Sequence, residues 1–333
     1  MAAPSDSPWP AGREGSAGAA TPGEAVLFQT HRFGGAEARA FARLQRGAPA
    51  GSDVRVLMSM PDGARPPPRL DAVPHEVIRP AELRPARYPR KSAPGPQGWD
   101  ITRDGHTDLL GLAYWRRRPS LRRLWVVEYD VRFSGDWAHF FAAFEASRAG
   151  LIAAAVRRRD HDPDWVHWQS WHFGPAWPAR MAGQFAAFMP VFRASGALLA
   201  AVDAAYAGGA AGHVEIVWPS LAMALGLGVE DLGGLGPFVA PDNRGRFYTA
   251  TPGRWDLRPG SFCYRPVRIA PGLRRNRLWH PVKPLHEKLA DDLRRLRDWA
   301  GRGAGRGGGQ RAGQRAGRRP GRGTDGGGRP GGG

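Results

Sequence analysis

Two carboxylates stand two positions apart directly after a short, strongly apolar run. Glu128 and Asp130 follow Leu124–Val127 (LWVV), and side chains at i and i+2 of an extended chain point to the same side. Like charges that close repel each other unless a cation lies between them, and carboxylate oxygens suit Mg²⁺ or Mn²⁺. The pair therefore indicates a divalent-cation site. The alternative is that both residues solvate the strand end or pair with Arg132.

A second polar stretch, at residues 160–172, suggests a different chemistry. It contains Asp160, His161, Asp162, Asp164, His167 and His172. These residue types are compatible with a metal-dependent hydrolase, but their spacing matches no standard ligand set, and Pro163 interrupts any helix. The tryptophans of the same stretch favour stacking on sugar rings, with packing beneath a loop as the alternative.

The elements that must position these residues begin with a strand–helix–strand unit. Residues 25–29 form an apolar run typical of a buried strand, 36–46 have the spacing of an amphipathic helix, and 54–58 return as a strand. Such a βαβ unit predicts a parallel sheet. In open sheets of this kind, ligands bind outside the carboxyl ends of the strands, which is where Glu128 and Asp130 lie.

Further elements follow along the chain. We predict strands at 76–78, 124–127 and 151–156, helices at 107–116, 137–149, 184–206 (broken at Pro190) and 284–300, and a strand leading into a helix at 214–225. The resulting fold is α/β: one domain over 24–300, with a mostly parallel, Rossmann-like central sheet flanked by helices and an irregular C-terminal half. Residues 1–23 and 301–333 lack an apolar period and are predicted to be disordered.

The net charge of +18 is unevenly distributed. The 301–333 tail contributes +7 through eight Arg and one Asp, and Lys occurs only three times in the chain. Such an Arg bias is typical of a GC-rich coding sequence, which argues against a nucleic-acid partner. RNA binding through the Gly/Arg-rich tail remains an alternative. The single cysteine excludes an internal disulfide framework, and without a transmembrane segment or secretory signal we expect a cytoplasmic protein.

Two segments resemble a known family. The segment LWVVEYDVRFSGDW (124–137) resembles the acidic motif of nucleotide-sugar-dependent glycosyltransferases of the GT-A fold, particularly the W-x-x-E-x-D-V-R-F-x-G-x-W segment of a poorly characterised glycosyltransferase-like family. The segment LWHPVK (278–283) is similar to the late histidine segment of several such families. The resemblance extends over about residues 24–285 and implies a GT-A-like fold.

The same resemblance assigns roles to individual residues. It makes Asp130 the principal ligand of Mn²⁺ or Mg²⁺, Glu128 its companion and His280 the third ligand, with Lys283 in contact with the phosphates. Glu128 stands where the strict motif has Asp, so it could instead contact the sugar or ribose. For His280, a capping or packing role before the helix at Pro284 is the alternative.

Four more candidates complete the predicted site. Glu215 would be the base that takes the proton from the acceptor hydroxyl, or a buried Glu paired with an Arg. Asp108 would contact the donor sugar, or merely favour the start of a helix. His31 and Arg32, at the end of the first strand, would face the nucleotide.

The resemblance thus implies a metal-dependent glycosyltransferase. Its partners would be a nucleotide-diphosphate sugar donor and a glycan or other hydroxyl acceptor. The RNA-binding protein and the metal-dependent hydrolase are the alternatives, and a transferase fold without activity is a third because a fold does not guarantee a function.

Overall fold

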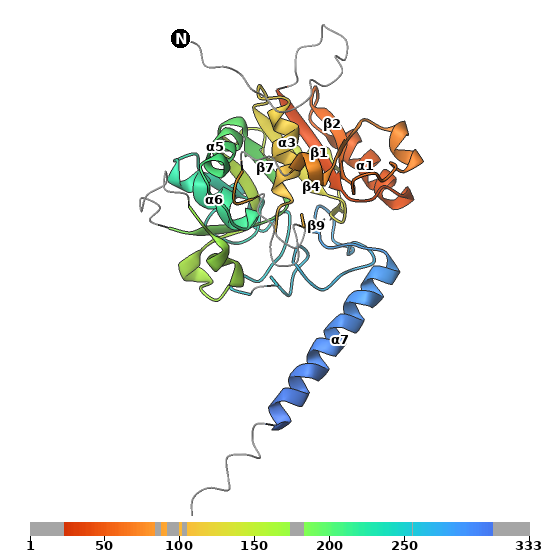
Figure 1. Cartoon of the computed structure of the whole chain (residues 1–333), viewed down its shortest axis with the longest axis vertical. Coiled ribbons are helices and arrows are strands. Elements are labelled where there is room, and N and C mark those ends of the chain that lie inside the picture. Colours follow the sequence, from red (N-terminus) through yellow and green to blue (C-terminus); the bar gives the residue numbers. More distant parts are fainter. Residues whose placement is uncertain are drawn as a thin grey trace, which may run out of the picture. The chain divides into compact units, whose positions relative to one another are not determined.

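The computed structural model describes residues 23–83, 88–91, 100–101, 105–173, 183–254 and 256–308. Its centre is a seven-stranded sheet in the order β3-β2-β1-β4-β7-β6-β8, of which Figure 1 labels β2, β1, β4 and β7. The strands are β1 (Glu24–Thr30), β2 (Asp53–Ser59), β3 (His75–Ile78), β4 (Arg123–Glu128), β6 (Leu151–Arg158), β7 (Phe185–Ser195) and β8 (Val229–Asp231). Every neighbouring pair is parallel except the two that include β7. The predicted α/β fold with a mostly parallel sheet is confirmed.

The central strands are apolar on both faces because helices cover both. In β1, Val26 and Phe28 belong to one core cluster, whereas Ala25 and Leu27 belong to the other, as the alternation of side chains along a strand requires. The helices are α1 (Gly35–Gly47), α2 (Pro80–Leu83), α3 (Asp108–Arg116), α4 (Trp137–Ala142), α5 (Gly196–Ala207) and α6 (Val214–Ala224). The aromatic residues of α1 and α4 pack with Phe28, and the apolar residues of α3, α5 and α6 pack with Leu27.

The N-terminal βαβ unit forms as predicted. Strand β1 pairs in parallel with both β2 and β4. Helix α1 follows β1 and buries Phe41 and Leu44. At its start the side chain of Glu37 accepts a hydrogen bond from Gly34 N (2.9 Å), which satisfies a backbone donor that a helix start leaves open.

The helix predicted over 184–206 is wrong in its first half, where strand β7 precedes α5. Almost every position of β7 is apolar, and such a run fits a buried strand and a buried helix equally well. Pro190 marks a strand irregularity: the register of β7 against β6 shifts between the pairs Ile152↔Arg193 and Ala154↔Phe188. A bulge there accommodates a residue that has no backbone N–H to donate.

The segment 214–225 was expected to begin as a strand but is helical from its first residue, as α6. His213 is the N-cap, and its Nδ1 accepts a hydrogen bond from Glu215 N (3.3 Å).

Helix α4 ends at Ala142, short of the predicted 149. Beyond α6 the described strands of this part are only two or three residues long, which agrees with the predicted irregular C-terminal half. Short 3₁₀ helices occupy Pro68–Ala72, Arg159–His161, Val166–Ser170 and Pro241–Asn243.

The chain divides into two compact units after Lys283. The second contains α7 (Leu285–Gly308), which corresponds to the helix predicted at 284–300 and continues past the predicted start of the tail at 301. The predicted leader, up to residue 22, and the tail from 309 lie outside the described residues. The RNA-binding hypothesis depends on that tail and therefore stays a hypothesis. None of the described helices combines the length and apolar character needed to cross a membrane.

Candidate metal centre

The predicted metal ligands meet because two segments far apart in the sequence pair as strands. After β4 ends, the chain turns into β5 (Arg132–Phe133), which pairs antiparallel with β9 (Leu278–Trp279). Beside this pairing, Val282 N donates a hydrogen bond to the carbonyl oxygen of Asp130 (2.8 Å). His280, one residue beyond β9, is thereby placed opposite the acidic end of β4.

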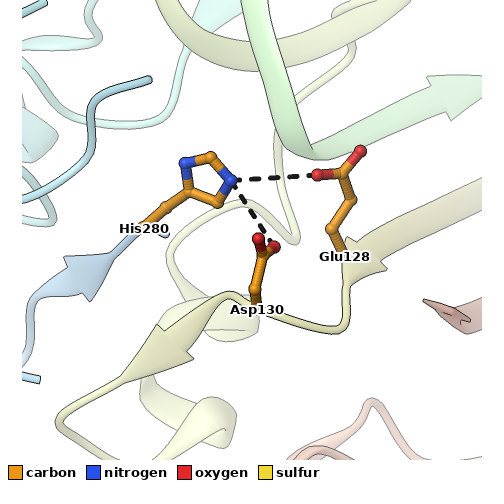
Figure 2. A group of neighbouring side chains, drawn as sticks. All are labelled: Glu128, Asp130 and His280. Carbon is orange, nitrogen blue, oxygen red and sulfur yellow. Dashed lines mark ion pairs between the residues drawn. The ribbon is translucent and has the colours of Figure 1, made fainter. Parts of the chain in front are cut away.

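Glu128, Asp130 and His280 point toward one another (Figure 2). His280 Nε2 lies 3.5 Å from Asp130 Oδ1 and 3.9 Å from Glu128 Oε2. Ligand atoms that each lie ~2.1 Å from one Mg²⁺ are at most ~4.2 Å apart, so both separations fit a shared cation. Among the described residues, this is the one group of three or more His, Cys, Asp or Glu side chains whose ligand atoms lie around one point.

Two atoms of this triad, Asp130 Oδ1 and His280 Nε2, are placed to bind a ligand. Asp130 Oδ1 is buried without a well-formed hydrogen bond among the described residues, and its contact is the ion pair with His280 Nε2 at 3.5 Å, so a bound cation would satisfy it better. His280 Nδ1 lies 2.9 Å from the carbonyl oxygen of Cys263. A carbonyl only accepts, so Nδ1 carries a proton and Nε2 faces the carboxylates. The donor set fits a hard divalent cation.

Neighbouring charges shift the pKa values of His280 and Asp130 in opposite directions. Burial by itself lowers the pKa of His280, but Asp130 and Glu128 outweigh it and raise that pKa above the usual value. Burial raises the pKa of Asp130, yet His280 and Lys283 hold it below its ordinary value. Lys283 Nζ lies 3.3 Å from Asp130 Oδ2. A cation bound here would replace the proton on His280, so binding is linked to proton release.

Glu128 and Glu215 have unusually high pKa values. Burial, the charge of Asp130 and that of Glu215 raise the pKa of Glu128 to about 7, although its side chain is still 30% exposed. Burial likewise raises the pKa of Glu215 to about 7, against the lowering effect of Arg157 and of a hydrogen bond from Met189 N (3.1 Å). Glu215 lies in the first turn of α6, close enough to Glu128 to shift its pKa.

The end of β1 lies beside the end of β4 because these strands are hydrogen-bonded neighbours. His31 and Arg32 both contact the ring of Tyr129: the His31 ring packs edge-on at 4.8 Å, and Arg32 Cζ lies 4.7 Å from the ring centroid. Lys283 Nζ lies 5.5 Å from the same centroid. Burial, together with the charges of Arg32 and Lys283, lowers the pKa of His31, so its imidazole is neutral at pH 7.

Tyr129 was not among the residues predicted for the site. Tyr129 and Asp130 lie in a turn after β4, which Val131 N closes on the carbonyl oxygen of Glu128 (3.0 Å), so strand alternation could not predict where the Tyr129 ring lies. The ring contacts the end of β1, at His31 and Arg32. Tyr129 therefore links the triad to the residues predicted to face the nucleotide.

Asp108 lies apart from this arrangement, in a fully buried network at the start of α3. Its Oδ1 is 3.3 Å from Lys91 Nζ, and neither side chain is exposed. Its Oδ2 accepts hydrogen bonds from the Tyr206 hydroxyl and from Trp218 Nε1 (3.2 Å). A carboxylate with three internal partners and no exposed surface stabilises the fold, and we do not retain it as a sugar contact.

The acidic and histidine-rich stretch after β6 is partly engaged in packing, whereas Asp160, His161 and Asp164 are exposed. Asp162 pairs with Arg157 (2.9 Å). Trp165 and Trp168 are buried in a small core cluster, so their faces do not form the expected sugar-stacking surface. His167 stacks on the N-cap histidine of α6 with ring centroids 4.2 Å apart. Among the described residues this stretch forms no metal-ligand group, which removes the observation that favoured a hydrolase.

No protein-family model matches this chain, and no curated protein matches its sequence. Among solved structures it is similar to the apo form of mouse xyloside xylosyltransferase 1, with 14% sequence identity over 52% of this chain and 67% of that chain and a TM-score of 0.29. A likeness this distant does not establish a function, so the α/β fold is assigned from the order and direction of the strands themselves.

Proposed function

We propose that this chain is a metal-dependent glycosyltransferase that moves a sugar from a nucleotide-diphosphate donor to a hydroxyl acceptor. The main support is the convergence of Glu128, Asp130 and His280 at the carboxyl end of β4. This is the edge of an α/β sheet at which ligands bind. The end of β1, with its aromatic and basic side chains, adjoins the triad at the same edge.

Glu128, Asp130 and His280 are the residues that would hold Mn²⁺ or Mg²⁺. When bound, such a cation offsets the negative charge that develops on the leaving diphosphate. With three ligands from the protein, the cation would still be able to accept phosphate oxygens. The exposure of Glu128 gives the triad an open side for the donor.

The donor would lie between Lys283 and the end of β1. Lys283 is partly exposed and stands beside Asp130, so its ammonium group can contact the diphosphate. Tyr129, His31 and Arg32 form a cluster of ring and guanidinium surfaces, which suits a nucleoside. The neutral His31 ring can donate or accept a hydrogen bond at a base or ribose.

The acceptor would approach from the side of α6. Glu215 carries a pKa of about 7, so at neutral pH a large fraction is ionised and able to take a proton from a hydroxyl group. A general base with a pKa close to the working pH is the most effective one. Its hydrogen bond from Met189 N (3.1 Å) holds the carboxylate in place.

Thermal unfolding in the presence of Mn²⁺ with UDP or GDP tests this proposal. We expect the wild type to be stabilised by nucleotide only when Mn²⁺ is present, and Asp130→Asn to lose that effect. Asp162→Asn is the matched control, because Asp162 is also a buried carboxylate paired with one cation but lies outside the triad. Nucleotide stabilisation that is equal in wild type and Asp130→Asn, or absent from the wild type, would refute the proposal.

A further inference from the structure

A cavity of about 440 Å³ lies outside the triad and is lined by arginines. Among the described residues, it is lined by Arg254, Arg258 and Arg268 together with Pro259, Gly260 and Pro266. Its volume falls within the range of about 300–1,000 Å³ that is usual for small-molecule sites. The cavity therefore has room for an organic molecule larger than a simple ion.

The charge of this cavity is only partly compensated. Asp256, whose side chain is completely buried, pairs with both Arg254 and Arg258. It also accepts a hydrogen bond from Arg258 N (3.1 Å). Its single negative charge is thus shared by two guanidinium groups, and the three arginines retain an excess of two positive charges around the cavity. The Arg254 side chain is 52% exposed.

Arg268 supplies a second, independent observation. Its Nη2 donates to the carbonyl oxygen of Gly260 (2.6 Å). Its guanidinium carbon lies 5.4 Å from the centroid of the Trp279 ring, which helps hold the group in place. Arg268 thus contributes a guanidinium charge that is held in place at the cavity.

The cavity is connected to the candidate metal centre through the backbone. Arg268 N donates to the carbonyl oxygen of Pro281 (2.9 Å), and Lys283 N donates to that of Arg268 (2.8 Å). Lys283 in turn contacts Asp130. The arginine cavity and the triad therefore flank the same short segment, yet they share no lining residue.

We propose that this cavity binds a phosphate group carried by an organic ligand other than the nucleotide donor. Guanidinium groups form paired, charge-assisted hydrogen bonds with phosphate oxygens, and an excess of two positive charges matches one phosphate dianion. The site needs no metal ion. Its occupation is therefore separable from the metal-dependent binding proposed for the triad.

Calorimetric titration with inorganic pyrophosphate in the presence of EDTA tests this site without a metal ion, and the same titration of Lys283→Gln separates it from the diphosphate contact proposed beside the triad. We expect wild type to bind and Arg254→Gln to bind roughly tenfold more weakly, as the loss of one charge-assisted hydrogen bond implies. Arg158→Gln is the matched control, because Arg158 is equally exposed (52%) and also pairs with an aspartate two residues further on. It should bind like wild type.

A second substitution keeps the test independent of any loss of folding. Arg268→Gln should also weaken pyrophosphate binding, and thermal unfolding checks that each variant is folded. Equal pyrophosphate affinities in wild type and Arg254→Gln, or no binding by wild type, would overturn the proposal. It would also be overturned if Arg254→Gln lost the Mn²⁺-dependent stabilisation by UDP, because the cavity would then be part of the donor site.

Discussion

Two buried aspartates of this chain have the same kind of cationic partner and opposite surroundings. Asp108 lies 3.3 Å from Lys91, and Asp130 lies 3.3 Å from Lys283. The side chains of Asp108 and Lys91 are completely buried. The Asp108 carboxylate also accepts hydrogen bonds from the Tyr206 hydroxyl and the Trp218 indole. Asp130 keeps one buried oxygen without a well-formed hydrogen bond among the described residues, and Lys283 remains 24% exposed.

This difference separates a structural carboxylate from a candidate ligand. A buried network whose members are all satisfied stabilises one conformation, and nothing more can bind to it. A buried oxygen that faces an imidazole and a second carboxylate, next to solvent, is stabilised when a cation arrives. Substitutions around Asp130 should therefore change binding and activity, whereas those around Asp108 should change stability.

The largest expected effect is on turnover. Glu215→Gln removes the proposed base but leaves the triad intact, so sugar transfer should slow by about 10²–10⁴-fold. Its Mn²⁺-dependent stabilisation by nucleotide should persist. Steady-state rates with a nucleotide-sugar donor, measured beside thermal unfolding, check both parts. Unchanged turnover would exclude Glu215 as the base.

The next effect is on stability. Asp108→Asn removes a buried negative charge beside Lys91 and should lower the free energy of unfolding by about 3–5 kcal/mol. Asp130→Asn makes the same chemical change at a similarly buried aspartate, but Lys283 is partly exposed to water and His280 keeps Glu128 as a partner, so the loss should be smaller. Denaturant unfolding of both variants measures the difference. Equal losses would contradict the distinction between the two aspartates.

A smaller effect concerns pH. Burial and the charge of His167 lower the pKa of His213 to about 3, whereas an unfolded histidine titrates near 6.5. The unfolded state therefore binds more protons between these values, and stability falls as the pH drops below 6.5. His213→Asn keeps an N-cap acceptor without this titration. It should be less sensitive to acid by about 3 kcal/mol at pH 4.

The raised pKa of Glu215 acts with the opposite sign. It favours the folded state as the pH falls through 7, but wild type and His213→Asn share it, so it cancels in the difference between them. Denaturant unfolding at pH 7 and pH 4 checks the prediction. Parallel losses of stability in the two proteins would show that His213 does not carry the acid sensitivity.

The smallest effect is expected at the end of β1. His31→Ala removes one ring from the cluster around Tyr129 and should weaken nucleotide binding by about fivefold, as the loss of roughly 1 kcal/mol implies. His161→Ala, at an exposed histidine, is the control. Titration with UDP or GDP in Mn²⁺ measures both. If the two variants bound alike, the nucleotide would have to lie elsewhere.

Much of the fold was predictable because its signals are local. The βαβ unit at the N-terminus and the strand before Glu128 follow from short apolar runs and helical spacing, and both are confirmed. Strand β7 was missed because it is apolar on both faces and contains Pro190, so periodicity could not separate it from a helix. Its bulge depends on pairing with β6, which is a long-range contact.

The convergence of the triad was predictable because a motif and a resemblance coincided. Glu128 and Asp130 are neighbours in sequence, but only the similar late segment connected them with His280, about 150 residues away. The pairing of β5 with β9 that brings them together involves two residues on each side and leaves no pattern in the sequence. The burial of Asp108 depended in the same way on Tyr206 and Trp218, which no local signal joins to it.

The most direct test is whether the triad binds a divalent cation. Titration with Mn²⁺, followed by electron paramagnetic resonance, counts bound ions without requiring a donor, an acceptor or turnover. We expect one site in wild type and in Asp162→Asn, and at least about tenfold weaker binding in Asp130→Asn, because one of three ligands loses its charge. Equal Mn²⁺ affinity in wild type and Asp130→Asn, or no bound Mn²⁺ in wild type, would contradict the assignment of Glu128, Asp130 and His280 as a metal centre.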